Sequence, residues 1–291
     1  MIKDLSFRRG RITKRFSAAV GSERSLLFAS IFSKTARKAI AEANTIKIEE
    51  VQIKLRRLPK KLDGFRIVHL SDIHHSPLTN LEHIKHAIEI ANNLQPDMFV
   101  LTGDYVSHER EYIEPVAEVL GGLSSEFGIF ACLGNHDHWT DAKLVTEAFT
   151  KNNIRMLINE GFRFTARDES FWLCGVDDYM MGKTDVRSAL NGSFPNEMKL
   201  LLSHNPQVIN RAAISNIDLV LSGHTHGGQV KIREPRERIL FPNRKRRLRS
   251  GLHRRKETQI YITRGIGTVV LPIRYQCPPE ISVLELKATI Y

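Results

Sequence analysis

Two histidines two positions apart, His224 and His226, are the first residues in this sequence whose types and spacing could do chemistry. They lie in the stretch LSGHTHGG, residues 221–228, directly after an apolar run that is typical of a buried strand. The glycines around them indicate that the strand has ended and the backbone turns. Two imidazoles on such a turn could each reach one ion of a dinuclear site. A polar loop without metal is the commoner explanation of an isolated pair. Whether these histidines bind metal therefore depends on further ligand residues upstream.

Four further apolar segments end in residue types that bind metals. The segments are 66–72, 98–104, 128–137 and 198–204. The polar residues at their ends are Asp72, Asp104, Asn135, His136, Asp137 and His204, and His74 follows the first segment. Helical stretches at 80–94 and 113–120 separate the first three segments. The end residues Asp72, Asp104 and Asn135 are 32 and 31 residues apart. This is the spacing of consecutive βαβ units, whose parallel strands bring their carboxyl ends to one edge of a sheet.

These candidate ligands are carboxylate, amide and imidazole groups, and no cysteine is among them. Such a set suits hard to borderline divalent ions, with Mn²⁺, Fe and Zn²⁺ as the candidates. Two ions about 3.5–4 Å apart need a ligand that bridges them, and a carboxylate has the two oxygens to do so. Asp104, central in the order of the ligands, is the expected bridge.

The motifs together resemble the calcineurin-like metallophosphoesterase superfamily. The blocks are SDIH at 71–74, GD at 103–104, GNHD at 134–137, then His204, and GHTH at 223–226. Three C-terminal blocks, GHTHGGQV, TRGIGTVVLPIR and PPEISVLEL, are similar to the YkuE- and YaeI-type bacterial branch, which includes the chlamydial-type UDP-2,3-diacylglucosamine pyrophosphatase. The resemblance implies an α/β fold with two packed mixed β-sheets flanked by helices, a four-layer sandwich.

The resemblance also implies roles for individual residues. One divalent ion would be held by Asp72, His74, Asp104 and His226, and a second by Asp104, Asn135, His204 and His224. The two ions would lower the pKa of a shared water, which supplies the attacking group near neutral pH. His136 would protonate or stabilise the leaving oxygen, and Asp137 would orient His136. A turn-forming role for Asp137 is the alternative.

The implied reaction is hydrolysis of a phosphoester or pyrophosphate bond. UDP-2,3-diacylglucosamine, cleaved to 2,3-diacylglucosamine 1-phosphate and UMP in lipid A synthesis, is the leading specific substrate. A general phosphodiesterase acting on nucleotides or glycerophosphodiesters would need the same metal site. A non-catalytic scaffold of the same fold is the second alternative, and it is disfavoured because every ligand position is filled.

The formal net charge of +11 is distributed unevenly. Residues 1–66 carry 17 Lys and Arg against 6 Asp and Glu, residues 231–256 carry 12 against 2, and the remainder carries 14 against 24. Because residues 231–256 follow the histidine pair directly, we expect this basic insertion beside the metal site, where it would attract an anionic substrate. A solvated loop is the alternative. Nucleic acid is disfavoured because Phe241 is the one stacking aromatic in the run.

We expect substrate contacts from the basic insertion and from the mouth of the metal site. Arg244, Arg246 and Arg247 of the basic insertion are predicted to bind the substrate, and His75 is a further candidate because it follows His74 at the mouth of the site. The predicted substrate is a phosphate-containing, amphiphilic small molecule.

The N-terminal segment 1–45 is interpreted separately from a catalytic domain over 46–291. Residues 22–43 fit a helix with a broad apolar face and interleaved Lys34, Arg37 and Lys38. Such a segment can lie on an anionic membrane surface, or it can pack on its own domain with a solvated basic side. The sequence leaves both interpretations open.

Cysteine spacing and hydropathy bear on location. Three cysteines without CxxC spacing argue against a disulfide framework and a thiolate zinc site, and they favour a reducing compartment. The best apolar run near the N-terminus, 26–32, is far shorter than the roughly 20 residues that span a bilayer. We therefore expect a cytoplasmic enzyme, peripheral on the inner face of the cytoplasmic membrane.

The remaining strands are predicted from short apolar runs. Residues 46–57 alternate apolar and polar side chains and predict a half-buried strand. Residues 162–165 and 171–175 predict a hairpin. Runs at 229–232, 259–263 and 281–286 have no helical partner, so we expect them to form a second, more antiparallel sheet packed on the first.

Overall fold

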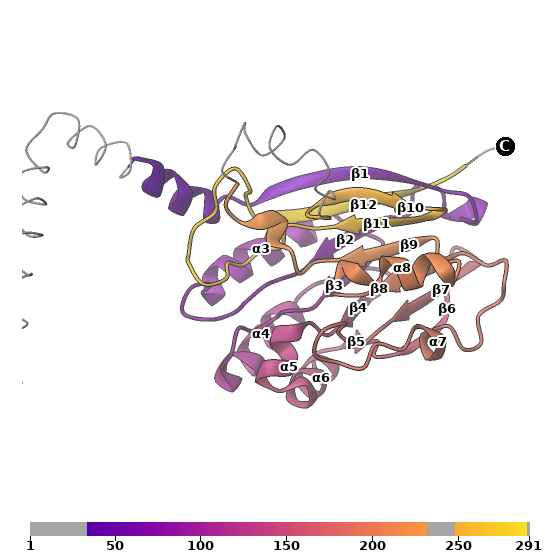
Figure 1. Cartoon of the computed structure of the whole chain (residues 1–291), viewed down its shortest axis with the longest axis horizontal. Coiled ribbons are helices and arrows are strands. Elements are labelled where there is room, and N and C mark those ends of the chain that lie inside the picture. The colour runs from indigo at the N-terminus through magenta and orange to yellow at the C-terminus, as the bar shows by residue number, and fades with distance from the viewer. Residues whose placement is uncertain (1–33, 232–247, 290–291) are drawn as a thin grey trace, which may run out of the picture.

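The computed structural model describes residues 34–231 and 248–289. Its two six-stranded sheets pack face to face (Figure 1). The first sheet has the order β1-β12-β2-β3-β4-β5. Its strands are β1 (Lys47–Leu55), β12 (Glu280–Ala288), β2 (Arg66–Leu70), β3 (Met98–Thr102), β4 (Ile129–Cys132) and β5 (Ile154–Met156).

The second sheet has the order β10-β11-β9-β8-β7-β6. Its strands are β10 (Gly251–Arg255), β11 (Thr258–Ile262), β9 (Leu219–Ser222), β8 (Lys199–Leu202), β7 (Glu169–Gly175) and β6 (Glu160–Ala166). The central strands β7, β8, β9 and β11 are parallel, and an antiparallel partner closes each edge. Both sheets are therefore mixed.

Helices cover the outer face of each sheet (Figure 1). Those on the first sheet are α3 (Leu81–Asn93), α4 (Ile113–Leu120), α5 (Asn135–Thr140) and α6 (Ala142–Lys151), and those on the second are α7 (Val186–Ala189) and α8 (Ile209–Ile214). Short 3₁₀ turns are η1 (Lys60–Leu62), η2 (Arg110–Tyr112), η3 (Pro206–Val208) and η4 (His226–Gly228). Residues 34–43 are also helical.

Three apolar layers hold these elements together. Along β2, Val68 and Leu70 point to the helices, whereas Ile67 points to the layer between the sheets, as the two-residue period of a strand requires. The middle layer joins residues of both sheets, such as Met98 and Leu200. A third layer packs the second sheet against α7 and α8. The expected four-layer sandwich is confirmed.

The predicted arrangement of the C-terminal strands is wrong in part. β11 pairs in parallel with β9, and β12 joins the first sheet between β1 and β2. The run 229–232 contributes only an isolated bridge from Val230 to Tyr275 among its described residues. The predicted 162–165 and 171–175 hairpin is confirmed as β6 and β7, in antiparallel register.

The described residues include three free, buried cysteines, Cys132, Cys174 and Cys277. Over the same part of the chain, no helix combines the length and the apolar character needed to cross a bilayer.

Candidate metal centre

The carboxyl ends of β2, β3 and β4 lie side by side because these strands are parallel and in register. The chain then turns sharply, and Asp72, His74 and Asp104 adopt positive φ values of 50°, 51° and 56°. Few non-glycine residues adopt this conformation, and here it turns the backbone so that these side chains face the same space. In the second sheet, His204 follows β8 and His224 follows β9. The five polar strand ends therefore meet between the two sheets.

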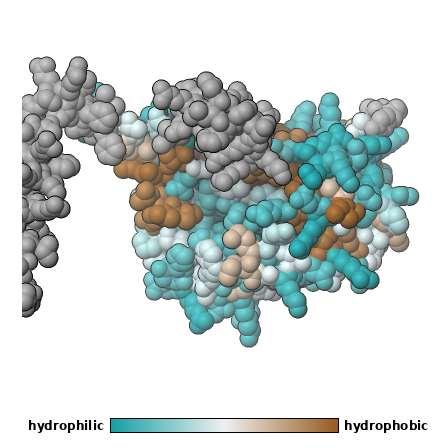
Figure 2. All heavy atoms as spheres, in the orientation of Figure 1, coloured by the Kyte–Doolittle hydropathy of each residue, from teal (hydrophilic) through white to brown (hydrophobic). Residues whose placement is uncertain are grey.

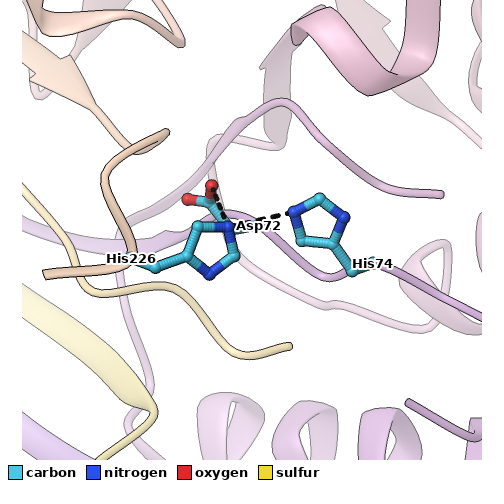
Figure 3. A group of neighbouring side chains, drawn as sticks. All are labelled: Asp72, His74 and His226. Carbon is cyan, nitrogen blue, oxygen red and sulfur yellow. Dashed lines mark hydrogen bonds and ion pairs between the residues drawn. The ribbon is translucent and has the colours of Figure 1, made fainter. Parts of the chain in front are cut away.

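The first ligand group consists of Asp72, His74 and His226, and all three are buried. The Nε2 atoms of His74 and His226 are 3.1 Å apart, and Nε2 of His226 is 3.3 Å from Oδ1 of Asp72 (Figure 3). Three potential ligand atoms thus converge on one point, and the side chains come from two segments more than 150 residues apart.

The second group consists of Asp104, His204 and His224, with Asn135 beside them. Nε2 of His204 is 3.0 Å from Oδ2 of Asp104 and 3.3 Å from Nδ1 of His224. Nδ1 of His224 is also 3.0 Å from Oδ1 of Asn135. These four side chains form a second point of convergence.

Asp104 connects the two groups. Its Oδ2 atom is 3.0 Å from His204 and 3.6 Å from Nε2 of His74. Its other oxygen accepts a 2.8 Å hydrogen bond from the backbone N–H of His136. The carboxylate is therefore fixed between both groups, which is the position that a bridging ligand requires.

The charges of the site favour a cation at these points. Nδ1 of His204 donates to the carbonyl of Thr102 at 2.7 Å, which directs Nε2 toward Asp104. Burial alone would lower the pKa of His204, but the attraction of Asp104 raises the pKa to about 10. Burial would likewise raise the pKa of Asp104, but the attraction of His204 and its hydrogen bond hold that pKa well below its usual range. Without a metal, a proton on His204 therefore balances the Asp104 carboxylate, and a cation bound between the two side chains would displace that proton.

The other three imidazoles are kept neutral by burial. Desolvation lowers the pKa of His74 to about 3, that of His224 to about 4, and that of His226 well below its ordinary value. Neutral imidazole is the form that binds a metal. The donor set therefore fits two divalent cations. Such cations, when bound, supply a nucleophilic hydroxide near neutral pH and stabilise charge on phosphoryl oxygens.

His136 lies beside both groups on the first turn of α5. Its Nδ1 is 2.8 Å from the carbonyl of Ser107, which can only accept, so Nδ1 carries the proton and Nε2 is the nitrogen left for a reacting group. The ring packs at 4.7 Å from His74 and 4.4 Å from Trp139. These contacts fix the ring at the edge of the ligand cluster.

The Asp137 carboxylate contacts backbone N–H groups and not the ring of His136. It accepts three backbone hydrogen bonds, from Asp104, Tyr105 and Gly134, at 2.8–2.9 Å. The contact that orients His136 comes instead from Ser107. Asp137 therefore ties the turn after β3 to the start of α5, and this corresponds to the turn-forming alternative.

Glycine at position 223 leaves room for the ligands. A Cβ atom there would lie 2.0 Å from Oγ of Ser71 and 2.2 Å from Oδ2 of Asp72. We expect Gly223→Ala to displace the Asp72 carboxylate and to weaken Mn²⁺ binding by about 10–100-fold. Calorimetric titration with Mn²⁺ measures this, with Gly122→Ala as the matched control, because the one close contact there is a carbonyl at 3.1 Å. Unchanged affinity in Gly223→Ala would show that Asp72 is not a ligand.

Comparison with known proteins agrees with this geometry. The sequence model of the calcineurin-like phosphoesterases matches residues 65–228. The chain belongs to this family. It is 31% identical to the uncharacterized metallophosphoesterase YkuE of Bacillus subtilis, over 85% of this chain and 88% of that protein. It is 32% identical to the phosphodiesterase YaeI of Escherichia coli, over 76% of this chain and 82% of that protein.

A third relative is larger. The transmembrane protein with metallophosphoesterase domain of Bos taurus is 31% identical over 83% of this chain, and the match spans 57% of that protein. The family fold implies a dinuclear divalent metal site, and the two ligand groups of this phosphoesterase could hold the ions.

A pocket of about 710 Å³ opens beside the second ligand group of the phosphoesterase. Its lining includes His224, Thr225, Leu248 and Arg249. The hydroxyl of Thr225 donates to the carbonyl of Arg249, which connects the described end of the basic insertion to the metal site. The insertion is not a loop throughout, because residues 251–255 form the edge strand β10.

The predicted substrate contacts have different outcomes. Arg244, Arg246 and Arg247 lie outside the described residues. His75 is only 5% exposed, its Nδ1 is 3.0 Å from the carbonyl of Thr79, and its ring packs against Tyr112. A substrate role for these four residues stays a prediction.

Two main-chain groups that hold site residues could not be predicted from the sequence. The carbonyl of Thr102 holds His204, and the carbonyl of Ser107 holds His136. Both interactions use backbone oxygens, which every residue type has. The sequence therefore contains no signal for either.

Proposed function

We propose that the chain hydrolyses a phosphodiester or pyrophosphate bond in an amphiphilic substrate. UDP-2,3-diacylglucosamine, cleaved to 2,3-diacylglucosamine 1-phosphate and UMP, is the specific substrate that we propose. The observation that carries the reaction type is the Asp104 carboxylate between two ligand groups, because a pair of ions can stabilise both the attacking and the leaving oxygen. We favour Mn²⁺ for both ions.

The pocket beside His224 supports a diester over a simple phosphate. A volume of about 710 Å³ is in the range of sites for drug-sized ligands. Arg249 offers a cation for a second phosphoryl group, and Leu248 and Val230 offer apolar contact. A nucleotide or sugar joined to the reacting phosphorus would therefore have protein groups to bind.

A general phosphodiesterase is the second candidate, and the name of the relative YaeI favours it. The metal site is the same in both cases, so only the relative rates on different substrates distinguish the two candidates. We expect kcat/KM for UDP-2,3-diacylglucosamine in Mn²⁺ to exceed that for bis-p-nitrophenyl phosphate by on the order of 100-fold, because contacts outside the reacting phosphorus lower the barrier. Release of UMP, followed by ³¹P NMR, measures the first reaction.

His224→Ala serves as the inactive control in both assays. Comparable values of kcat/KM for the two compounds would favour the general phosphodiesterase. Turnover of bis-p-nitrophenyl phosphate without any release of UMP would exclude the lipid nucleotide.

A further inference from the structure

The loop between β11 and β12 presents an apolar tip to solvent. Val270 is 84% exposed and Leu271 is 54% exposed, and they follow each other in the sequence. Single exposed apolar residues are ordinary, but adjacent ones at a loop tip indicate a contact surface. No ligand of the metal centre lies in this loop.

The backbone at the tip is strained. Val270 has a φ of 66°, in the left-handed region, which a β-branched side chain rarely adopts. Such a conformation persists when the surrounding structure holds it. The loop therefore has a defined shape that presents valine outward.

Gln229 holds the tip from both sides. Its Oε1 accepts from the N–H of Val269 at 3.0 Å, and its Nε2 donates to the carbonyls of Val269 and Leu271 at 3.0 and 3.1 Å. Gln229 comes three residues after His226. The tip is thus attached directly to the segment that carries a metal ligand.

Arg274 fixes the base of the loop. It is fully buried, and its guanidinium donates to the carbonyls of Arg264, Gly265, Gly267 and Cys277. The N–H of Gly267 in turn donates to the carbonyl of Asp72 at 2.7 Å. Tip, base and metal centre therefore form one connected structure.

Two further segments extend the apolar surface. Helix 34–43 contributes Ile40, 49% exposed, and the turn before α3 contributes Leu78, 44% exposed. Both line a hollow of about 90 Å³ together with Pro272 of the loop. Figure 2 shows hydrophobic surface at the left end of the molecule, where helix 34–43 and the yellow loop lie in Figure 1.

The helix that contributes Ile40 to the apolar surface also carries exposed basic side chains. Lys34, Arg37 and Lys38 are exposed on the helix that also carries Ile40, and Arg37, three positions before Ile40, lies on the same side of that helix. The N–H of Arg274 donates to the carbonyl of Ala39 at 3.0 Å, which attaches this helix to the loop. An apolar surface that includes a helix with exposed lysine and arginine matches a bilayer interface with anionic lipids, which offers acyl chains and negative headgroups together.

We propose that Val270, Leu271, Ile40 and Leu78 form a membrane-contact surface that seats the protein on an anionic bilayer. Valine and leucine enter the boundary between headgroups and acyl chains, while Lys34, Arg37 and Lys38 bind anionic headgroups. The surface is separate from the metal ligands, and this contact does not depend on the identity of the substrate.

Vesicle flotation with the full chain tests the contact. Wild-type protein is expected to bind phosphatidylcholine vesicles that contain phosphatidylglycerol, and to bind pure phosphatidylcholine more weakly. The double variant Val270→Asp, Leu271→Asp should lose on the order of tenfold or more in partition coefficient. Two apolar side chains that would enter the bilayer are then replaced by anions. Aspartate tolerates positive φ better than valine does, so the loop should keep its fold.

Ile214→Asp is the matched control, because Ile214 is 78% exposed at the end of α8, a helix that packs on the second sheet. It should float like wild type, and all variants should hydrolyse bis-p-nitrophenyl phosphate at the wild-type rate. Equal flotation of the double variant and wild type would overturn the proposal. So would absence of wild-type binding to either vesicle, or a wild-type dimer that the double variant dissociates, because a second copy would then cover the surface.

Discussion

Asp104→Asn is expected to abolish metal-dependent hydrolysis while the protein stays folded. The Oδ2 atom of Asp104 lies 3.0 Å from Nε2 of His204 and 3.6 Å from Nε2 of His74, so this carboxylate contacts ring nitrogens of both ligand groups. Asparagine keeps the shape but removes the charge that two cations would share. We expect kcat to fall by on the order of a thousandfold or more, since charge stabilisation by the metal ions is the main source of catalysis in such sites.

The assay is hydrolysis of bis-p-nitrophenyl phosphate in Mn²⁺, with far-UV circular dichroism as the check on folding. Asp168→Asn is the matched control, because the Asp168 side chain is 91% exposed in a turn and contacts Lys61 rather than the site. Full activity in Asp104→Asn would rule out a shared carboxylate between two ions.

His136→Ala is expected to lower turnover with both metal ions retained. Nδ1 of His136 donates to the carbonyl of Ser107, so Nε2 is the nitrogen that, once protonated, can donate to the leaving oxygen. A positioned acid of this kind typically contributes 10²–10⁴-fold, so we expect a loss of about that size for an alkoxide leaving group. The loss should be much smaller for p-nitrophenolate, which departs without a proton.

The comparison of leaving groups separates acid catalysis from a structural effect. Damage to the metal site would reduce turnover of both substrates alike and would lower the metal content. His86→Ala is the control, because its side chain is 62% exposed on α3. An equal loss for both leaving groups in His136→Ala would contradict proton donation.

The first half of the fold was predictable because its signals are local. β2, β3 and β4 are buried strands separated by helices, and that pattern permits little other than adjacent parallel strands. Polar residues directly after such strands must then share one edge. This is why Asp72, Asp104 and Asn135 could be placed together from the sequence.

The position of β12 had no such signal. It enters the first sheet between β1 and β2 from more than 200 residues away, and its partners are chosen by tertiary packing. A buried apolar run looks the same in either sheet. The positive φ of Val270 could not be predicted for a related reason. The contacts of Gln229 and Arg274 hold this loop, whereas valine itself does not favour that conformation.

The role of Asp137 shows the limit at the site itself. Its residue type and its place next to His136 are visible in the sequence, and orientation of the histidine was one reasonable interpretation. Only the structure shows that three backbone N–H groups use this carboxylate. Side-chain types therefore predicted which residues converge, whereas contacts made by the backbone required coordinates.

Metal content is the most direct test of a dinuclear centre. Protein is loaded with Mn²⁺ and freed of loosely bound ions by gel filtration. Inductively coupled plasma mass spectrometry should then find about two ions per chain, and the rate of hydrolysis should rise as both sites are filled. His224→Ala should bind fewer ions and be inactive. One ion per chain with full hydrolysis, or hydrolysis that persists after complete removal of metal, would contradict a reaction that depends on two ions joined by Asp104.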